Sequence, residues 1–455
     1  MIYKDNSFLS SESDFISNHP KIHKNLMNRT LKKLVCDNSI LLIDSNSNGP
    51  SSLDTSSKIF ESVDGKIFSG NVLGILGIED ELISLKSRFS SENDDFFTYY
   101  LLEKVLGYKV IGLHSGISYE SAVYSLLEYI FPIYLDEAMR KGIYKEYVRV
   151  SYNDKNIRGS IDVNRHLKQN IPFQGNFSYS TREISYDNDV TQLIRHTIEH
   201  LKNEDVSITK RMQDNPQTKK NIDEIRYYTS TYSKSNKQKV IHRNMNKVIS
   251  HAYFHEYRFL QKICLLILSN KKHTPFNSKN LKYGILFDIS WLWEEYVALL
   301  FEDKFIHPQN RTGFLKQYLF RNQNDVYKKL IYPDFIGTKQ YDNIVADAKY
   351  KPEKNIKSSD YHQLLSYMFR FNRNIGFFIH PQKKTNITKT TEELILLDGV
   401  GLDLKERSPQ IRIQNLKFNI PQNNYSNYTE FSNLMKIEEQ KFLDKLDNFS
   451  FKACY

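Results

Sequence analysis

The segment IYPDFIGTKQYDNIVADAKYK, residues 331–351, places charged side chains inside two runs of apolar, strand-like sequence. Asp334 interrupts the first run, and Asp347, Lys349 and Lys351 interrupt the second. Charged groups are costly to bury unless they are paired or bind a metal. A chain that keeps these charges in such segments has to fold so that they converge on one another or on a ligand.

The spacing of these residues predicts how they meet. Residues two apart on a strand point to the same face, so Asp347 and Lys349 project together. A hairpin turn between Gly337 and Asn343 would bring Asp334 back beside that pair. Oxygen ligands in such a place suit Mg²⁺, which keeps several waters and takes phosphate oxygens as partners. With a lysine to position or help deprotonate a metal-bound water, the segment predicts hydrolysis of a phosphodiester.

Helical patterns flank the two strands. The preceding one, SWLWEEYVALLF, carries Glu294 and Glu295. A glutamate at the border of its apolar face would reach the metal as a third carboxylate, whereas the alternative is that both are ordinary exposed residues. In the following helix, DYHQLLSYMFRF, Gln363 and Tyr367 are four residues apart and share one face. Both residues are therefore predicted to face the same site.

The length of 455 residues is too great for one compact core, so we expect two or three domains. We predict an α+β module over residues 1–115 and a mostly helical region over 116–275. Residues 276–455 alternate helix and strand patterns and predict an α/β domain. Within the middle region, the sequence also predicts a β-hairpin around residues 153–156.

Net charge points to an anionic partner. The formal charge is +10 and the pI is near 9.0, which favours nucleic acid. Residues 208–250 contain ten Lys or Arg against three acids, with tyrosines interleaved. Basic groups neutralise phosphates and aromatic rings stack on bases, although a solvated helical face is the alternative. The residues that we predict to bind DNA are Lys234, Lys237, Lys239, Arg243 and Lys247.

Other features exclude several classes of protein. Cys36, Cys264 and Cys454 are scattered and form no CxxC, which argues against a disulfide scaffold and a zinc site and fits a reducing cytoplasm. His251 and His255 are one helical turn apart, but the glutamate of HExxH is missing, so we do not expect a metal there. No signal-peptide pattern or membrane-spanning run is present. We expect a soluble, cytoplasmic protein with no membrane partner.

The pattern PD…DAK, the preceding helix with WEEYV and the following Q-x-x-x-Y helix together resemble the PD-(D/E)xK nuclease superfamily, in its subgroup with a QxxxY helix. More closely, the chain is similar to the McrC-type nuclease subunits of GTP-dependent restriction systems, including the LlaJI type. Residues 87–107 and 157–201 look like signatures of that family. The resemblance covers most of residues 66–380.

This resemblance implies an α/β fold with a C-terminal restriction-endonuclease-like core in the order αβββαβ, preceded by α+β and mostly helical regions. It implies that two aspartates and one glutamate bind Mg²⁺, that a lysine is catalytic, and that a glutamine and a tyrosine lie near the DNA backbone. The metal-binding residues are Asp334, Asp347 and Glu294, and the other catalytic residues are Lys349, Gln363 and Tyr367.

The resemblance also implies a partner. The chain has no GxxxxGK[ST] and therefore no P-loop of its own. Relatives work beside an McrB-like AAA+ GTPase, which binds GTP, so residues 1–275 would dock to that motor. The implied function is Mg²⁺-dependent cleavage of DNA in an anti-phage restriction system. The alternatives are a non-catalytic DNA-binding and assembly subunit that stimulates the GTPase, and a nuclease that acts on RNA or on DNA ends.

Overall fold

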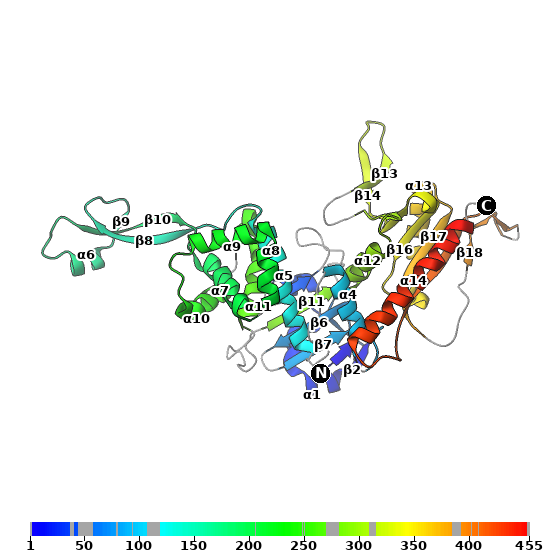
Figure 1. Cartoon of the computed structure of the whole chain (residues 1–455), viewed down its shortest axis with the longest axis horizontal. Helices are drawn as coiled ribbons and strands as arrows, with labels where there is room; N and C mark the ends of the chain where they lie inside the picture. Colours follow the sequence, from blue (N-terminus) through cyan, green and yellow to red (C-terminus); the bar gives the residue numbers. More distant parts are fainter. Residues whose placement is uncertain are drawn as a thin grey trace. The chain divides into compact units, whose positions relative to one another are not determined.

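A computed structural model of the chain describes residues 2–36, 41–43, 58–78, 81–92, 94–106, 119–204, 206–247, 249, 251–269, 282–308, 315–384, 393–401, 403–407 and 409–452. The chain forms two compact units, one from Met1–Val123 with Pro275–Tyr455 and one from Tyr124–Thr274. Helices and several sheets occur along it, so the prediction of a mixed α/β chain is confirmed (Figure 1).

The first unit contains a six-stranded sheet in the order β12-β15-β16-β17-β21-β18. Strands β16, β17 and β21 run parallel, and the other pairings are antiparallel. Along the chain, α12 precedes β12, β15 and β16, and α13 connects β16 to β17. The elements are α12 (Ile289–Leu300), β12 (Phe305–Ile306), β15 (Phe335–Gly337), β16 (Ile344–Ala348), α13 (Ser358–Phe371), β17 (Ile375–Lys383), β18 (Glu393–Ile395), β21 (Arg412–Ile420) and α14 (Tyr428–Lys452).

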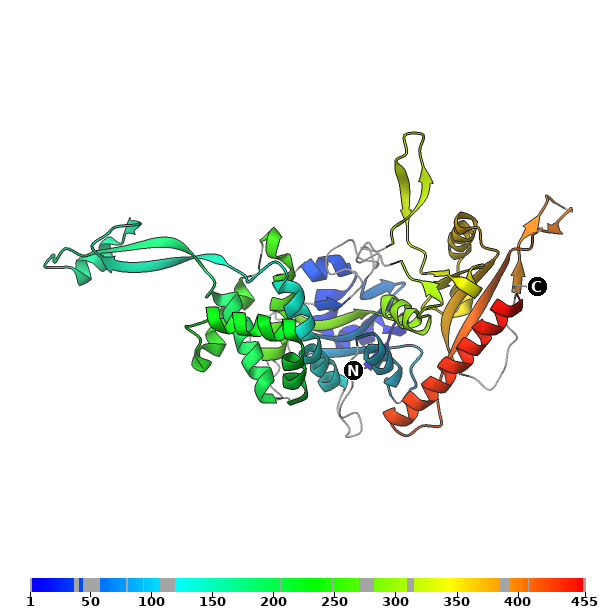
Figure 2. The same cartoon turned by 45° about the horizontal axis from the view of Figure 1, so that its top comes forward.

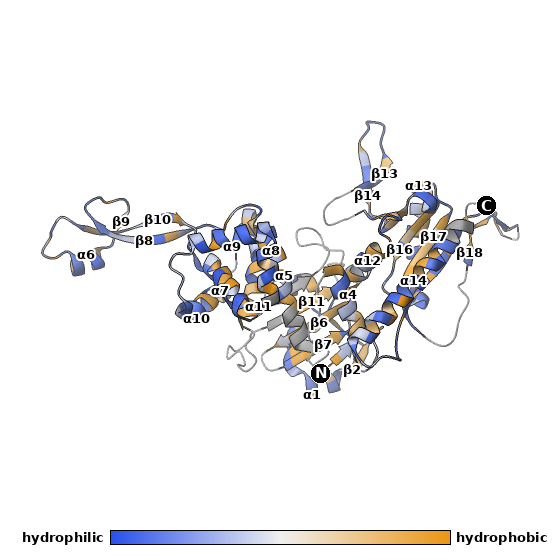
Figure 3. Ribbon diagram, in the orientation of Figure 1, coloured by the Kyte–Doolittle hydropathy of each residue, from blue (hydrophilic) through white to orange (hydrophobic). Residues whose placement is uncertain are grey.

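Helices cover both faces of this sheet, which explains why its central strands read as nearly continuous apolar runs (Figure 3). Helix α13 packs on the face that carries Val345 and Phe378, through Leu364 and Met368. Gly376 permits this close approach, because a Cβ there would lie 2.7 Å from the sulfur of Met368. On the opposite face, Trp293 of α12 and Phe442 of α14 pack against Phe418 of β21.

A second sheet of the same unit has the order β1-β7-β6-β11-β3. Its strand β11 is antiparallel to β6 and parallel to β3. Strand β11 ends at Asp288, whose side chain accepts the backbone N–H of Ser290 at 2.9 Å and caps α12. Helix α12 therefore starts directly from this sheet. The strands are β1 (Ile2–Lys4), β3 (Leu41–Ile43), β6 (Val72–Ile78), β7 (Glu81–Lys86) and β11 (Lys282–Asp288).

Smaller elements complete the first unit. A three-stranded sheet has the order β2-β5-β4, and two hairpins are formed by β13 with β14 and by β19 with β20. The ribbon of β13 and β14 stands off the larger sheet in both views (Figures 1 and 2). The elements are β2 (Phe8–Ser11), α1 (Glu12–Asn18), α2 (Pro20–Leu26), α3 (Leu31–Cys36), β4 (Phe60–Val63), β5 (Lys66–Ser69), α4 (Phe96–Leu106), β13 (Gln317–Arg321), β14 (Tyr327–Ile331), β19 (Leu397–Asp398) and β20 (Lys405–Glu406).

The second unit combines helices with a three-stranded sheet in the order β8-β10-β9. The predicted hairpin around residues 153–156 is wrong, because β8 pairs along its whole length with β10, which lies between β8 and β9. The elements are β8 (Glu146–Asp154), β9 (Ser160–Ile161), α6 (Val163–Gln169), β10 (Phe177–Ser185), α7 (Asp189–Glu204), α8 (Val206–Asp214), α9 (Pro216–Tyr228), α10 (Lys237–Asn246) and α11 (His255–Ser269), preceded by α5 (Tyr119–Met139), which begins in the first unit. Across the described part of the chain, no helix has the length and apolar character needed to cross a membrane.

Candidate active site

Asp334 and Asp347 face each other across neighbouring strands. Strands β15 and β16 pair with Phe335 opposite Ala346, and continuing this antiparallel register sets Asp334 opposite Asp347. The Oδ2 atom of Asp334 accepts the backbone N–H of Ala348 at 2.7 Å. The turn between the two strands thus places Asp334 beside the second strand, as the hairpin pattern in the sequence predicts.

Lys349 lies beside the same pair. Its Nζ is 2.6 Å from Oδ2 of Asp347, a carboxylate that is only 2% exposed. Burial acts to lower the pKa of Lys349, but the carboxylates of Asp347 and Asp334 outweigh it and raise that pKa above its usual value. The lysine is therefore held as an ammonium between the two aspartates.

The site holds more acidic groups than basic ones. Burial, with help from Glu294, raises the pKa of Asp334 to about 7. Burial and the charge of Asp334 raise the pKa of Asp347 to about 7. Burial, Glu295 and Asp347 together raise the pKa of Glu294 to about 8. Three carboxyl groups that resist ionisation beside one ammonium form a place where a divalent cation would be favourable.

The donor set fits magnesium through two of these carboxylates. Within the described ranges, no group of three or more His, Cys, Asp and Glu side chains is arranged to hold a metal ion. Magnesium in phosphate-processing sites is bound through one or two carboxylates, with waters and phosphate oxygens as the other ligands. Asp334 and Asp347 meet that requirement. The assignment of Glu294 as a third ligand stays a prediction.

Helix α13 contributes the amide and phenol of the predicted Q-x-x-x-Y pair. The Nε2 of Gln363 donates to the hydroxyl oxygen of Tyr367 at 2.9 Å. On its other side, Oε1 of Gln363 accepts from Nζ of Lys349 at 3.4 Å. Tyr367 is buried and its hydroxyl donates weakly to the carbonyl of Tyr332, at 3.5 Å. These contacts connect Lys349, Gln363 and Tyr367, and Lys349 connects them to Asp347. Glu294 is related to the two aspartates through its charge.

His307 is a site residue that sequence reasoning missed. Its Nδ1 donates to the main-chain carbonyl of Asp334 at 2.8 Å, and its Nε2 lies 3.9 Å from Oε1 of both Glu294 and Glu295. The ring stacks on Phe335 with centroids 5.2 Å apart. No motif marks this histidine, and only the pairing of β12 with β15 brings it to the carboxylates.

Arg88 was missed as well. Its Nη2 donates to the carbonyl of Tyr350, the residue after Lys349, at 3.0 Å, and pairs with the buried carboxylate of Asp5 at 3.2 Å. The hydroxyl of Tyr350 bonds Oγ of Ser87 at 2.6 Å. The chain directly after β16 is thus anchored to the N-terminal part of the same unit.

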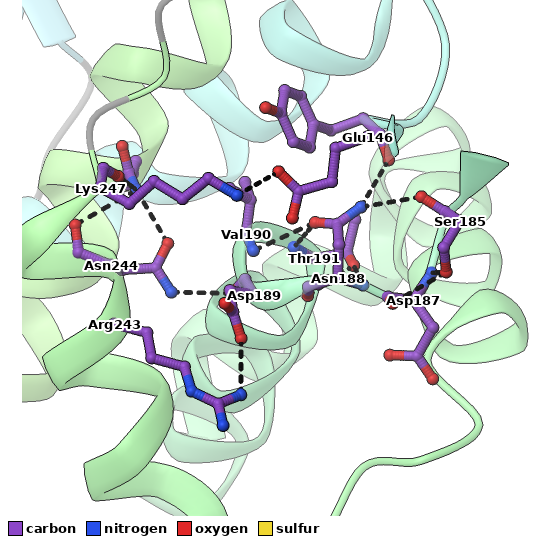
Figure 4. A network of polar contacts seen from close by, with 12 residues as sticks. Glu146, Ser185, Asp187, Asn188, Asp189, Val190, Thr191, Arg243, Asn244 and Lys247 are labelled. Carbon is purple, nitrogen blue, oxygen red and sulfur yellow. Dashed lines mark hydrogen bonds and ion pairs between the residues drawn. The ribbon is translucent and has the colours of Figure 1, made fainter. Parts of the chain in front are cut away.

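The predicted DNA-binding residues lie in the second unit. Figure 4 shows that two of them are engaged with acidic neighbours: Lys247 Nζ lies 2.6 Å from Glu146 Oε2, and Arg243 Nη1 donates to Asp189 Oδ1 at 3.1 Å. The other three, Lys234, Lys237 and Lys239, lie at the start of α10 or just before it. A role of these five residues in DNA binding stays a prediction.

Comparisons with known proteins place the chain in a family. The model of the family described as "McrBC 5-methylcytosine restriction system component" matches residues 68–381. No curated protein matches the chain. One similar solved structure is the refined half-complex from the tetradecameric assembly of Thermococcus gammatolerans McrB AAA+ hexamers with bound McrC. A chain of that structure is 14% identical to this one, with a TM-score of 0.41, and the match covers 95% of this chain and 98% of that chain. A chain of the cryo-EM structure of the Thermococcus gammatolerans McrBC complex is 14% identical, with a TM-score of 0.28 over 67% and 87%.

Proposed function

Because this chain belongs to the family of McrBC 5-methylcytosine restriction system components, we propose that it is the nuclease subunit of a GTP-dependent, LlaJI-like restriction system. In this proposal it is a Mg²⁺-dependent endodeoxyribonuclease that hydrolyses phosphodiester bonds of phage DNA in the cytoplasm. The observation that carries the proposal is the convergence of Asp334, Asp347 and Lys349 at one end of a sheet. These residues lie within the part of the chain that the family model matches.

The arrangement of elements supports a PD-(D/E)xK core. The chain order α12, β12, β15, β16, α13, β17 has the αβββαβ form that the resemblance implies. Asp334 comes just before β15, Asp347 lies in β16 and Lys349 follows it, so each residue of the PD…DAK pattern has the expected element. The β13–β14 hairpin is an addition between the first two strands of that order.

The chain's own residues would share the chemistry as follows. Asp334 and Asp347 would hold the cation. Magnesium bound there would supply charge for the phosphoryl oxygens and would lower the pKa of a bound water. Lys349, kept as an ammonium, would orient the attacking water or the phosphate through its remaining N–H groups. Gln363 would fix the lysine through their contact at 3.4 Å, and Tyr367 would hold Gln363 in place.

We propose an McrB-like AAA+ GTPase as the protein partner, with GTP bound on that subunit. The chain itself has no P-loop sequence. An exposed protein-contact surface is available on the second unit, where several large apolar side chains around β9 and α6 face solvent. They are Ile157, Ile161, Val163, Leu167, Ile171 and Phe173.

The test is DNA cleavage by the full chain together with its genomic-neighbour GTPase, Mg²⁺ and GTP. We expect Asp347→Ala to abolish cleavage while stimulation of GTP hydrolysis persists. Asp342→Ala is the matched control, because Asp342 is an exposed carboxylate in the turn before the same strand. Equal cleavage by wild type and Asp347→Ala would refute the site. Stimulation of GTP hydrolysis without cleavage by wild type would favour the assembly-subunit function.

A further inference from the structure

The β13–β14 ribbon (residues 317–331) exposes side chains that a folded chain normally covers. All residues from 320 to 330 are exposed. Phe320 is 59% exposed and Tyr327 is 61% exposed, and Val326 and Leu330 also face solvent. A two-stranded ribbon without a covering layer is marginally stable by itself. Its exposed aromatic and aliphatic side chains therefore indicate a surface that binds something.

The charge of the ribbon identifies the kind of partner. Arg321, Lys328 and Lys329 carry positive charge, as does Lys316 directly before β13, and Asp325 is the single acid between residues 315 and 331. Arg321 pairs with Asp325 at 3.2 Å, so the three lysines supply the net charge of the surface. Lysine is depleted from protein–protein interfaces, whereas lysines neutralise phosphates and apolar side chains contact thymine methyl groups in the major groove. The combination of lysines with exposed aromatic and aliphatic side chains favours a nucleic acid over a protein as the partner.

The ribbon is connected to the candidate active site on both sides. Strand β14 ends at Ile331, three residues before Asp334. Strand β13 is tied to α13, since Nε of Arg370 donates to the carbonyl of Tyr318 at 2.8 Å. Helix α13 is the helix that carries Gln363 and Tyr367. A duplex held by the ribbon would therefore lie next to the residues that we propose to cut it.

The backbone of the ribbon has a local distortion at a charged residue. Lys329 has a φ of 59°, a left-handed conformation that is unfavourable for residues other than glycine. Tyr318 pairs with Leu330 and Phe320 with Lys328, and Lys329 lies between these pairs. Backbone strain of this kind is often kept where it directs a side chain for binding.

We propose that the β13–β14 ribbon is a DNA-contacting element of this nuclease, in which Lys316, Lys328 and Lys329 bind backbone phosphates and Phe320 and Tyr327 contact the bases or sugars. A two-stranded β-ribbon fits the major groove of B-DNA. This inference rests on the proposed function, because the ribbon would deliver DNA to the site of Asp334 and Asp347. It differs from the prediction for residues 234–247, which lie in the second unit.

The experiment measures binding of a fluorescent DNA duplex to the full chain in complex with its GTPase partner, with Ca²⁺ in place of Mg²⁺ to prevent cleavage. In the triple variant Lys316→Ala/Lys328→Ala/Lys329→Ala, we expect Kd to rise about tenfold or more. The slope of log Kd against log salt should fall by about two to three, since each phosphate contact contributes nearly one. The double variant Phe320→Ser/Tyr327→Ser should weaken binding with little change of the salt slope.

The matched control removes three exposed lysines elsewhere in the same unit, Lys405, Lys436 and Lys445, and should bind DNA as wild type does. Cleavage by the same proteins in Mg²⁺ is measured separately, which separates this inference from the cleavage proposal. Binding by wild type that fails to cut, with weakened binding by the triple variant, would refute only the cleavage proposal. Unchanged Kd and salt slope in the triple variant, or no DNA affinity in wild type, would overturn the inference. Lost GTPase stimulation with normal DNA binding would overturn it too, and would assign the ribbon to the protein partner.

Discussion

The ammonium nitrogen of Lys349, the residue that follows β16, lies 2.6 Å from the carboxylate of Asp347, two residues earlier in the chain. The two side chains point to the same side because side chains alternate along extended backbone. Burial raises the pKa of both Asp334 and Asp347, and the positive charge of Lys349 acts to lower both. Several consequences of this arrangement can be measured.

Replacement of Lys349 tests its proposed role in cleavage. We expect Lys349→Met to lower the single-turnover cleavage rate by about 10²-fold or more, the range typical for loss of a positioned hydrogen-bond donor that stabilises developing charge. Lys349→Arg keeps the charge, but its planar fork does not reproduce a point ammonium, so it should restore activity only partly. A Lys349→Met protein that cuts as fast as wild type would remove the lysine from the mechanism.

His307 should act as a positioning residue for the carboxylates. Its Nδ1 holds the carbonyl of Asp334, and its Nε2 lies 3.9 Å from Glu294. We expect His307→Ala to weaken Mn²⁺ binding, measured by calorimetry, by about tenfold, as is typical when a group that orients metal ligands is lost. His307→Asn can retain a donor near the Nδ1 position and should recover most of the affinity. Equal metal affinity in wild type and His307→Ala would show that the histidine serves packing alone.

The buried pair of Arg88 and Asp5 should be a large contributor to stability. Asp5 is fully buried, and Arg88 also donates to Tyr350 and Asn71. Arg88→Ala leaves the Asp5 carboxylate without its cation and should lower the free energy of unfolding by about 3–5 kcal/mol, measured by urea denaturation. Adding Asp5→Asn to that variant removes the unpaired charge. The loss of unfolding free energy in the double variant should therefore be smaller than the sum of the losses in the two single variants. Simple additivity would contradict coupling between the two residues.

Stability should also depend on pH through Asp95. Burial raises the pKa of Asp95 from 3.8 to about 7, although Ser90 and Thr98 donate to its Oδ1. Between these two values the folded chain keeps a proton that the unfolded chain has lost, so the free energy of unfolding falls as pH rises through this window. The slope is at most about 1.4 kcal/mol per pH unit.

Asp95→Asn removes that ionisation and keeps an acceptor for the two hydroxyl groups. The melting temperature of Asp95→Asn minus that of wild type should therefore increase steadily from pH 4 to pH 7 and stay constant above pH 7. The comparison is made by differential scanning fluorimetry of both proteins at each pH. Parallel curves for the two proteins would show that Asp95 does not titrate in this range.

The sequence alone determined the local geometry of the candidate site. The alternation of apolar and charged residues in 331–351 predicted two strands, a turn and the shared direction of Asp347 and Lys349. The four-residue spacing of Gln363 and Tyr367 predicted a common helical face, and their side chains do meet. These inferences held because the periods of strands and helices depend on the backbone geometry of a few neighbouring residues.

Tertiary structure decided which distant segments complete the site. Strand β11 joins the N-terminal sheet, and β10 separates β8 from β9. His307 contacts the carbonyl of Asp334, and Arg88 contacts the carbonyl of Tyr350, each from a segment distant in the sequence. The exposure of the β13–β14 ribbon also became visible only in the fold. Pairings between segments that are far apart in the sequence depend on packing and on the closure of long loops. Side chains outside a helix or strand also leave no periodic pattern in the sequence that would reveal their partners.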